Sequence, residues 1–235
     1  MRRRLFLGLV AIALAAAGCG GNDQGGGGGG TGQKQYKLTL IQGVKGDQFY
    51  ITMQCGAQQA AQAAGATLDV AAPDEFDASL QTPVVNAVVA KHPDAILVAP
   101  TDTKAMIPPL TQAKQAGIKL IFVDTTTENG AELAESEIAS DNEEGGREAA
   151  RTLAKLTGGK GSVFVVNVKP GISTTDARAK GFEEEIKNTP GLKYIGQEYS
   201  NDKPEIAAAK TTAALAAHPD LVGVFGTNLF SAEGA

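Results

Sequence analysis

Residues 77–124 read DASLQTPVVNAVVAKHPDAILVAPTDTKAMIPPLTQAKQAGIKLIFVD, and this stretch decides the fold class. It alternates two helix-favouring segments, 77–91 and 103–116, with two short apolar runs, 95–99 and 119–123. Apolar runs of strand length that are separated by crossover helices are typical of a parallel sheet buried on both faces. We therefore expect an α/β fold.

The same alternation continues on both sides of this stretch. Upstream, the pattern predicts a helix at 48–64 and strands at 37–41 and 67–70. Downstream, a second series of elements begins after residue 142. It predicts helices at 143–156, 175–187 and 204–217, and strands at 162–166, 193–199 and 221–225.

The two series share a local motif. His92-Pro93-Asp94 and His218-Pro219-Asp220 each end a predicted helix and lead into an apolar strand. This echo favours a structural role for both histidines over metal binding or acid–base work, since a histidine suits a helix C-terminus. We expect two doubly wound parallel-sheet lobes, at 36–140 and 141–235, joined by a hinge near 138–142.

Composition excludes several classes of function. The chain has 235 residues and a formal net charge of −5, with no basic run after residue 18, so we expect no nucleic-acid partner. Two cysteines and two histidines are too few for a Cys/His zinc site, and we expect no metal and no cofactor. Cys55 lies in the predicted helix at 48–64, and we expect it to be a buried thiol.

The N-terminus is typical of a secreted protein. Arg2–Arg4 precede an apolar stretch, Leu5–Ala17, that is shorter than the ~20 residues a membrane-spanning helix needs. Small residues leading into Cys19 resemble a bacterial lipobox, so we expect a signal peptide at 1–18 and lipidation of Cys19. The Gly-rich segment at 19–35 suits a flexible tether. The alternative is ordinary cleavage near Ala17, with Cys19 incidental.

Four segments, in order along the chain, carry a family resemblance: Asp47–Tyr50, Ala99–Asp102, Ile138–Asn142 and Gly171–Phe182. Together they resemble the ribose-binding-protein-like branch of periplasmic sugar-binding proteins, the solute receptors of ABC importers. The resemblance runs from about Tyr36 to the end of the chain. It implies a hinged two-lobe receptor that closes on one small polar ligand.

The resemblance implies ligand contacts in the N-terminal lobe. Phe49 and Tyr50 match positions whose rings stack on the apolar faces of a sugar, and the alternative for either ring is packing within the lobe. Asp47, beside them, is a candidate acceptor for a ligand hydroxyl. Asp124 follows the strand at 119–123 and matches an aspartate that takes two hydroxyls; its alternative role is to cap a turn.

The resemblance is less regular in the C-terminal lobe. Where the family usually has an arginine, six residues before Phe182, this chain has Asp176, and Arg178 stands nearby. A family Asn-Asp pair is here Asn228-Leu229, which keeps an amide and loses a carboxylate. We expect Asp176, Arg178 and Asn228 to contact the ligand.

Two further positions bear on the ligand. Asn201 or Asp202, in the loop before the helix at 204–217, is expected to complete the cleft. Ala99 stands where ribose binders often have asparagine. These departures argue against ribose itself and favour another monosaccharide or a polyol. A ligand with a cationic group is the less favoured alternative.

The resemblance implies a lipid-anchored, monomeric, extracytoplasmic receptor that captures a small sugar or polyol by hinge closure and delivers it to ABC permease subunits. The alternative is a sensory receptor that presents the ligand to a membrane signalling partner. An enzyme is disfavoured, since the sequence has no P-loop and no G-x-S-x-G elbow, and the glycine run contains no credible dinucleotide fingerprint. Family members commonly continue beyond the position of Ala235, so we expect the C-terminal lobe to be incomplete.

Overall fold

The computed structural model describes residues 34–235, and Gln35–Ala235 form one compact unit. The predicted signal peptide, Cys19 and nearly all of the predicted tether lie outside the described residues. No helix in the described part of the chain is both long and apolar enough to cross a bilayer.

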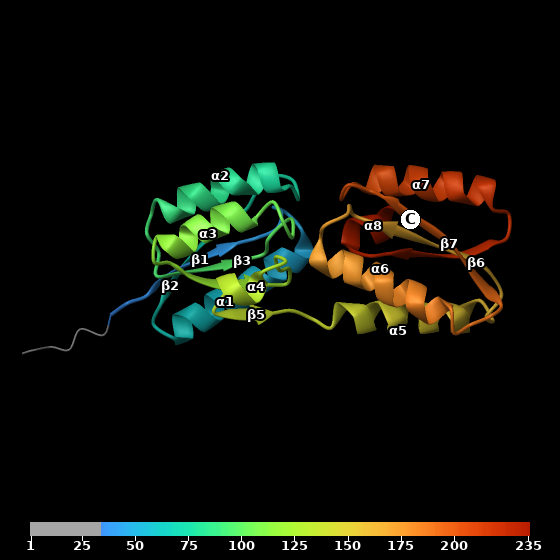
Figure 1. Ribbon diagram of the computed structural model, residues 1–235, viewed down its shortest axis with the longest axis horizontal. Helices are drawn as coiled ribbons and strands as arrows, with labels where there is room; N and C mark the ends of the chain where they lie inside the picture. The colour runs from blue at the N-terminus through green and yellow to red at the C-terminus, as the bar shows by residue number, and fades with distance from the viewer. Residues whose placement is uncertain (1–33) are drawn as a thin grey trace, which may run out of the picture. The chain divides into compact units, whose positions relative to one another are not determined.

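The N-terminal lobe is built on a five-stranded parallel sheet with the strand order β2-β1-β3-β4-β5 (Figure 1). Its elements are β1 (Lys37–Ile41), α1 (Gln48–Ala63), β2 (Thr67–Ala71), α2 (Ala78–Val89), β3 (Ala95–Val98), α3 (Ile107–Gln115), β4 (Lys119–Val123), α4 (Gly130–Leu133) and β5 (Ser136–Ile138).

The C-terminal lobe is built on a three-stranded parallel sheet with the order β7-β6-β8. Its elements are α5 (Asn142–Leu156), β6 (Gly161–Asn167), α6 (Ser173–Ile186), β7 (Leu192–Tyr199), α7 (Pro204–Ala217), β8 (Leu221–Gly226) and α8 (Leu229–Gly234). The α/β class with two parallel sheets is thus confirmed. The predicted lobe boundary after residue 140 lies in the short link between β5 and α5.

Three local predictions differ from the structure. The helix predicted at 103–116 begins only at Ile107, because Pro108 and Pro109 have no N–H to bond to carbonyls upstream. β5 and α4 were not predicted, since each is very short and β5 is exposed. The prediction that Cys55 is buried is wrong. Cys55 follows the inward-facing Met53 by two residues, about 200° around the helix, and so faces outward.

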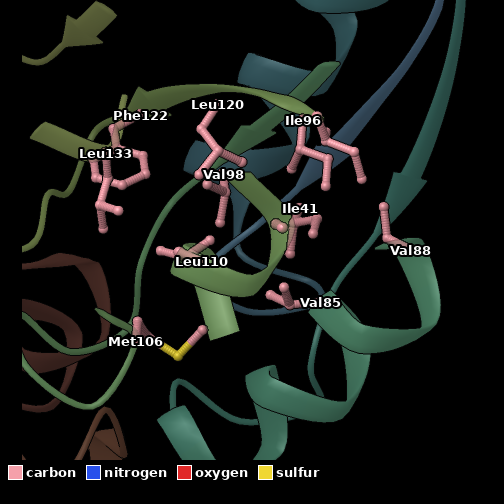
Figure 2. Close-up of a cluster of buried hydrophobic side chains, with 12 residues drawn as sticks. Ile41, Val85, Val88, Ile96, Val98, Met106, Leu110, Leu120, Phe122 and Leu133 are labelled. Carbon is pink, nitrogen blue, oxygen red and sulfur yellow. The ribbon is translucent and has the colours of Figure 1, made fainter. Parts of the chain in front are cut away.

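Both faces of the N-terminal sheet are covered, which explains the continuous apolar runs. Ile41 belongs to a core cluster with α2 and α3, whereas its neighbour Leu40 packs on the opposite face with α1. Figure 2 shows the first of these clusters: strand residues Ile41, Ile96, Val98, Leu120 and Phe122 meet Val85, Val88, Met106, Leu110 and Leu133. Tyr50 is part of the second cluster, so the core extends to the start of α1.

In the C-terminal lobe, α5 and α6 cross at two glycines. A Cβ on Gly146 would lie 2.0 Å from the Arg178 carbonyl oxygen, and a Cβ on Gly181 would lie 1.9 Å from the Glu143 carbonyl oxygen. Only glycine permits such a close approach of the two backbones. This contact fixes the part of α6 that carries Arg178.

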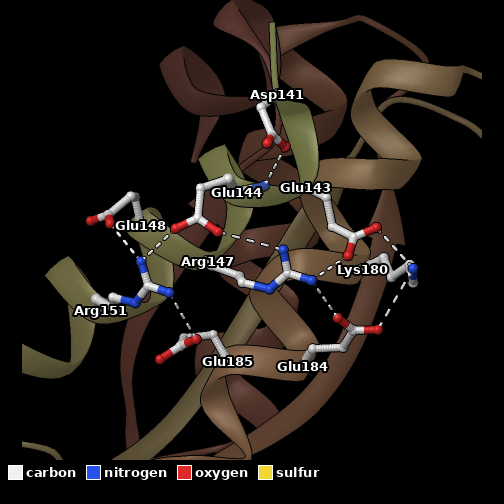
Figure 3. A network of polar contacts seen from close by, with 9 residues as sticks. All are labelled: Asp141, Glu143, Glu144, Arg147, Glu148, Arg151, Lys180, Glu184 and Glu185. Atoms are coloured by element: carbon white, nitrogen blue, oxygen red, sulfur yellow. Dashed lines mark hydrogen bonds and ion pairs between the residues drawn. The ribbon is translucent and has the colours of Figure 1, made fainter.

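A network of charged side chains covers the same helix pair (Figure 3). Arg147 bridges the helices through Glu143 on α5 and Glu184 on α6, and Arg151 bridges them through Glu144 and, on α6, Glu185. Lys180 adds a bond of 2.8 Å to Glu143, also across the two helices. Linked pairs of this kind join α5 to α6, although each exposed pair alone contributes little to stability.

Candidate functional site

A cavity of ≈ 200 Å³ is lined by residues from both lobes. The lining residues are Asp47, Phe49, Tyr50, Phe76, Asp124, Val168, Ile172, Thr174, Thr175, Arg178, Asp202, Asn228 and Leu229. Each lies after the carboxyl end of a strand, namely β1, β2, β4, β6, β7 or β8, where open α/β sheets bind their ligands. The cavity is smaller than the roughly 300–1,000 Å³ of pockets for drug-sized molecules, and so suits one small ligand.

Most of the residues singled out from the sequence meet in this cavity. They are Asp47, Phe49, Tyr50, Asp124, Arg178 and Asn228. Asp176 and Asn201 do not line it. The Asp176 carboxylate instead accepts hydrogen bonds from Asn167 Nδ2 (3.1 Å) and Gly171 N (2.8 Å), so it stabilises the loop between β6 and α6.

Asn201 is exposed, and its neighbour Asp202 lines the cavity in its place. Both residues have positive φ, 51° and 62°, and the Asn201 N–H donates to the Val168 carbonyl at 2.8 Å. This tight turn directs the second of the two side chains to the cavity. From the sequence, Asp202 was expected only as the alternative to Asn201.

At the start of α1, Asp47 caps the helix, and its Oδ1 accepts a hydrogen bond of 2.8 Å from the Phe49 N–H. The cap fixes the backbone that carries the Phe49 ring, which is 48% exposed. The Phe49 and Tyr50 rings meet edge to face with their centroids 5.1 Å apart. Phe49 therefore offers an aromatic surface to the cavity at little conformational cost.

Tyr50 is only 3% exposed and packs in the lobe's core, which was the alternative to stacking. Its hydroxyl donates a hydrogen bond to Asp124 Oδ2. Asp124 follows β4 with φ 68°, a left-handed conformation, and its N–H donates to the Ile138 carbonyl at 2.8 Å. The end of β4 is thus held from both α1 and β5.

Burial dominates the electrostatics of this wall. Burial and the negative charge of Asp124 raise the pKa of the Tyr50 hydroxyl well above its usual value, so Tyr50 remains a donor. Burial also raises the pKa of the Asp124 carboxyl, and the Tyr50 hydrogen bond and the positive charge of Arg178 oppose that rise. An acceptor held in this way is poised to take a hydrogen bond from a ligand hydroxyl.

Arg178 is held by two hydrogen bonds of 2.8 Å, from Nε to Asn142 Oδ1 and from Nη1 to the Thr227 carbonyl. These bonds fix the guanidinium in the cavity wall. Asn228 donates from Nδ2 to Asp202 Oδ1 at 2.6 Å and accepts from the Ser231 N–H at 3.0 Å, which caps α8. Burial raises the pKa of the Asp202 carboxyl, and the Asn228 bond opposes the rise.

Several lining residues were not predicted to contact the ligand: Phe76, Val168, Ile172, Thr174, Thr175 and Leu229. Phe76 follows β2 just as Phe49 follows β1, so the rule of strand carboxyl ends could have found it. Its place depends on a glycine, because a Cβ on Gly43 would lie 2.3 Å from Phe76 Cε2 and 2.4 Å from the Tyr50 hydroxyl oxygen.

Taken together, the cavity offers carboxylates from both lobes (Asp47, Asp124 and Asp202), one guanidinium and two phenylalanine rings. Carboxylates accept hydrogen bonds from hydroxyls, and aromatic rings pack against C–H groups. Among residues 34–235 there is no cluster of His, Cys, Asp or Glu that could hold a metal ion. The carboxylates and rings that line the cavity fit a small molecule with several hydroxyl groups and an apolar face.

Solved structures of solute-binding proteins resemble this chain over most of its length. An ABC transporter solute-binding protein from Agrobacterium vitis, bound with α-D-tagatopyranose, superposes with a TM-score of 0.83 at 46% identity, covering 85% of this chain and 70% of that one. A solute-binding protein from Mycobacterium smegmatis, with bound glycerol, has a TM-score of 0.77 at 27% identity, covering 86% of this chain and 69% of that one.

Sequence comparison also finds related proteins. Residues 38–235 match the family model described as a periplasmic binding protein domain. A D-apiose import binding protein from Actinobacillus succinogenes is 28% identical over 180 residues, 77% of this chain and 57% of that protein. A D-ribose/D-allose-binding protein from Pseudomonas aeruginosa is 26% identical over 209 residues, 85% of this chain and 64% of that protein. The chain thus spans less than two thirds of the length of either curated relative.

Proposed function

Because this chain belongs to the periplasmic binding protein domain family, we propose that it binds one small sugar or polyol between its lobes and delivers it to the permease subunits of an ABC importer. The observation that carries the proposal is the cavity itself, whose lining comes from both lobes and combines carboxylates with the rings of Phe49 and Phe76. A ligand that contacts both lobes stabilises the closed state, and that state is what a permease recognises. The ligand is released chemically unchanged.

In this proposal the side chains divide into two roles. Asp47, Asp124 and Asp202 accept hydrogen bonds from ligand hydroxyls, and Arg178 donates to a ligand oxygen. Phe49 and Phe76 pack against the C–H faces of the ligand. Asp176 and Asn201 have no direct contact with it. Because three carboxylates and one guanidinium line the cavity, the site favours ligands with free hydroxyls over ligands with a carboxylate.

The relatives narrow the ligand class. The solved relative at 46% identity is bound with a ketohexose, α-D-tagatopyranose, and the curated relatives are named for D-apiose and for D-ribose or D-allose. We propose a monosaccharide or a polyol of similar size. We further propose that lipidation of Cys19 anchors the receptor outside the cytoplasm, and that it acts as a monomer.

A thermal-shift screen tests the ligand class. The purified chain is heated with D-tagatose, D-ribose, D-allose, D-apiose, xylitol and glycerol, and with amino acids as controls. A ligand at 100 times its dissociation constant stabilises the folded protein by about 2.7 kcal/mol, which gives a clear rise in melting temperature. A rise with at least one sugar or polyol, and none with amino acids, is expected. No rise with any member of the panel contradicts the proposal.

A further inference from the structure

The loop between β2 and α2 reaches the other lobe on either side of Phe76. On one side, Asp77 Oδ2 lies 3.2 Å from Lys169 Nζ, in the loop between β6 and α6. On the other side, Glu75 Oε1 lies 3.7 Å from Lys203 Nζ, which immediately precedes α7. The ring that lines the cavity is therefore flanked by two ion pairs that join the lobes.

Asp77 is rigidly oriented for this contact. It caps α2, since its Oδ1 accepts hydrogen bonds from the Ser79 N–H (2.8 Å) and hydroxyl (2.6 Å), and this leaves Oδ2 for Lys169. The bonds from Ser79, assisted by Lys169, lower the pKa of Asp77 to about 2, so the carboxylate is ionised at neutral pH. The partner is equally confined, because the Lys169 side chain is only 23% exposed.

Lys169 also acts on the cavity. Its positive charge opposes the rise in the pKa of the Asp202 carboxyl, which lines the cavity from the C-terminal lobe. Lys169 is thus within electrostatic reach of a carboxylate on each lobe, Asp77 and Asp202. Two uncharged hydrogen bonds also join the lobes, from Thr103 N to the Gly171 carbonyl (2.9 Å) and from Thr126 N to Ser173 Oγ (3.0 Å).

We propose that the Asp77–Lys169 and Glu75–Lys203 ion pairs form a latch that holds the lobes closed and Phe76 against the ligand, and so sets how long the ligand stays bound. This inference rests on the proposed function, since it takes the cavity as the ligand site. A ligand enters while the lobes are apart, before the pairs form, but it leaves only after both pairs break. Loss of the latch therefore accelerates release of the ligand.

A double-mutant cycle at the more buried pair provides the test. Asp77→Asn removes the charge and keeps the helix cap, because asparagine is as good a capping residue as aspartate. Asp77→Asn and Lys169→Gln should each accelerate D-tagatose release by roughly two- to fivefold, the range typical of a partly exposed ion pair. The double variant should be no faster than the faster single variant, since both remove the same interaction. High salt should reduce the difference from the unaltered protein.

The matched control is Lys45→Gln. Lys45 pairs with Asp74 at 3.6 Å in the same part of the molecule, but this pair lies wholly within the N-terminal lobe. Lys45→Gln should leave the release rate unchanged. Equal effects of Lys45→Gln and Lys169→Gln, or fully additive effects of Asp77→Asn and Lys169→Gln, would overturn the latch.

A measurement without ligand separates failure of the latch from failure of the proposed function. Spin labels are placed on Cys55, which is exposed on α1, and on a Leu215→Cys substitution on α7, in a Cys19→Ala background. The Asp77→Asn/Lys169→Gln variant should shift the inter-label distances to longer values, and Lys45→Gln should not. An unchanged distribution contradicts the latch. A shift in a protein that binds no sugar supports the latch and contradicts the proposed function.

Discussion

The Tyr50 hydroxyl donates a hydrogen bond of 2.9 Å to Asp124 Oδ2, which joins residues 74 positions apart in the sequence. Tyr50 lies in the first turn of α1, and Asp124 follows the last residue of β4. The bond ties the helix that carries Phe49 to the strand end that carries the buried carboxylate. It makes one wall of the cavity a rigid unit.

Replacing Tyr50 with phenylalanine tests this relationship. Tyr50→Phe keeps the packing of the ring but leaves a buried carboxylate oxygen without its donor, and we expect a loss of about 1–3 kcal/mol in the free energy of unfolding. Urea denaturation measures the loss. Tyr194→Phe, in β7 and outside the cavity lining, serves as the control and should cost less. Equal stability of Tyr50→Phe and the unaltered protein would show that the bond contributes nothing.

Gly43 is the residue that admits two aromatic rings to the cavity. Gly43→Ala places a methyl group against Phe76 and Tyr50, so at least one ring must move, and overpacking of this kind typically costs about 1–3 kcal/mol. We expect both lower stability and weaker sugar binding, measured by denaturation and calorimetry. Gly56→Ala, on α1, has no atoms near the added methyl group and should be neutral or slightly stabilising. Normal sugar affinity in Gly43→Ala would argue against the position of Phe76.

The buried Asp124 carboxyl predicts a pH dependence of stability. Because its pKa is higher in the folded protein than the ~3.9 of an unfolded aspartate, the folded state binds more protons between these two values. Stability contributed by this group therefore falls as pH rises through that interval. We therefore compare the free energy of unfolding of Asp124→Asn with that of the unaltered protein. The difference should favour the variant more at about pH 7 than at about pH 4.

Denaturation at both pH values measures this difference, and Asp220→Asn provides a control of opposite sign. The hydrogen bond from Ser162 lowers the pKa of Asp220, so removing that carboxylate should cost more at the higher pH. The same pH trend in both variants would contradict the assignment of the Asp124 shift to burial.

Phe49 and Leu156 are both exposed, but only Phe49 lines the cavity. Phe49→Ala should leave stability nearly unchanged, because so much of the ring is in contact with solvent, and should weaken sugar binding by roughly tenfold, as expected for losing about 1.5 kcal/mol of aromatic contact. Leu156→Ala, at a side chain 83% exposed on α5, should change neither property. Calorimetric titration separates the two variants. Undiminished sugar affinity of the Phe49→Ala variant would show that the Phe49 ring does not contact the ligand.

Much of the fold could be predicted because buried parallel strands leave a clear trace in the sequence. Ile96 and Leu97 point to opposite faces of the sheet, and each meets a covering helix, so the whole run must be apolar. The same trace is lacking in β5, which is exposed and only three residues long. The outward position of Cys55 depends on which face of α1 is buried, and an alanine-rich helix indicates its faces only weakly.

The site was predictable where a side chain follows a strand directly, as Asp124 does. It was not predictable where loop geometry decides the direction of a side chain. Asp176 turns inward to bond Asn167 and Gly171, and a left-handed turn brings Asp202 rather than Asn201 to the cavity. Nothing in the sequence around Gly43 indicates that a residue without a side chain is required there. The requirement comes from two rings that are far apart in the sequence, those of Tyr50 and Phe76.

The most direct test of the central claim is calorimetric titration of D-tagatose into the unaltered protein and into two variants, one from each lobe, Asp124→Ala and Asp202→Asn. A sugar held by both lobes should bind the unaltered protein saturably, and each variant should lose at least roughly tenfold in affinity, since a hydrogen bond to a charged group contributes about 1.5–3 kcal/mol. Saturable binding that neither variant weakens would contradict the claim that this cavity is the ligand site.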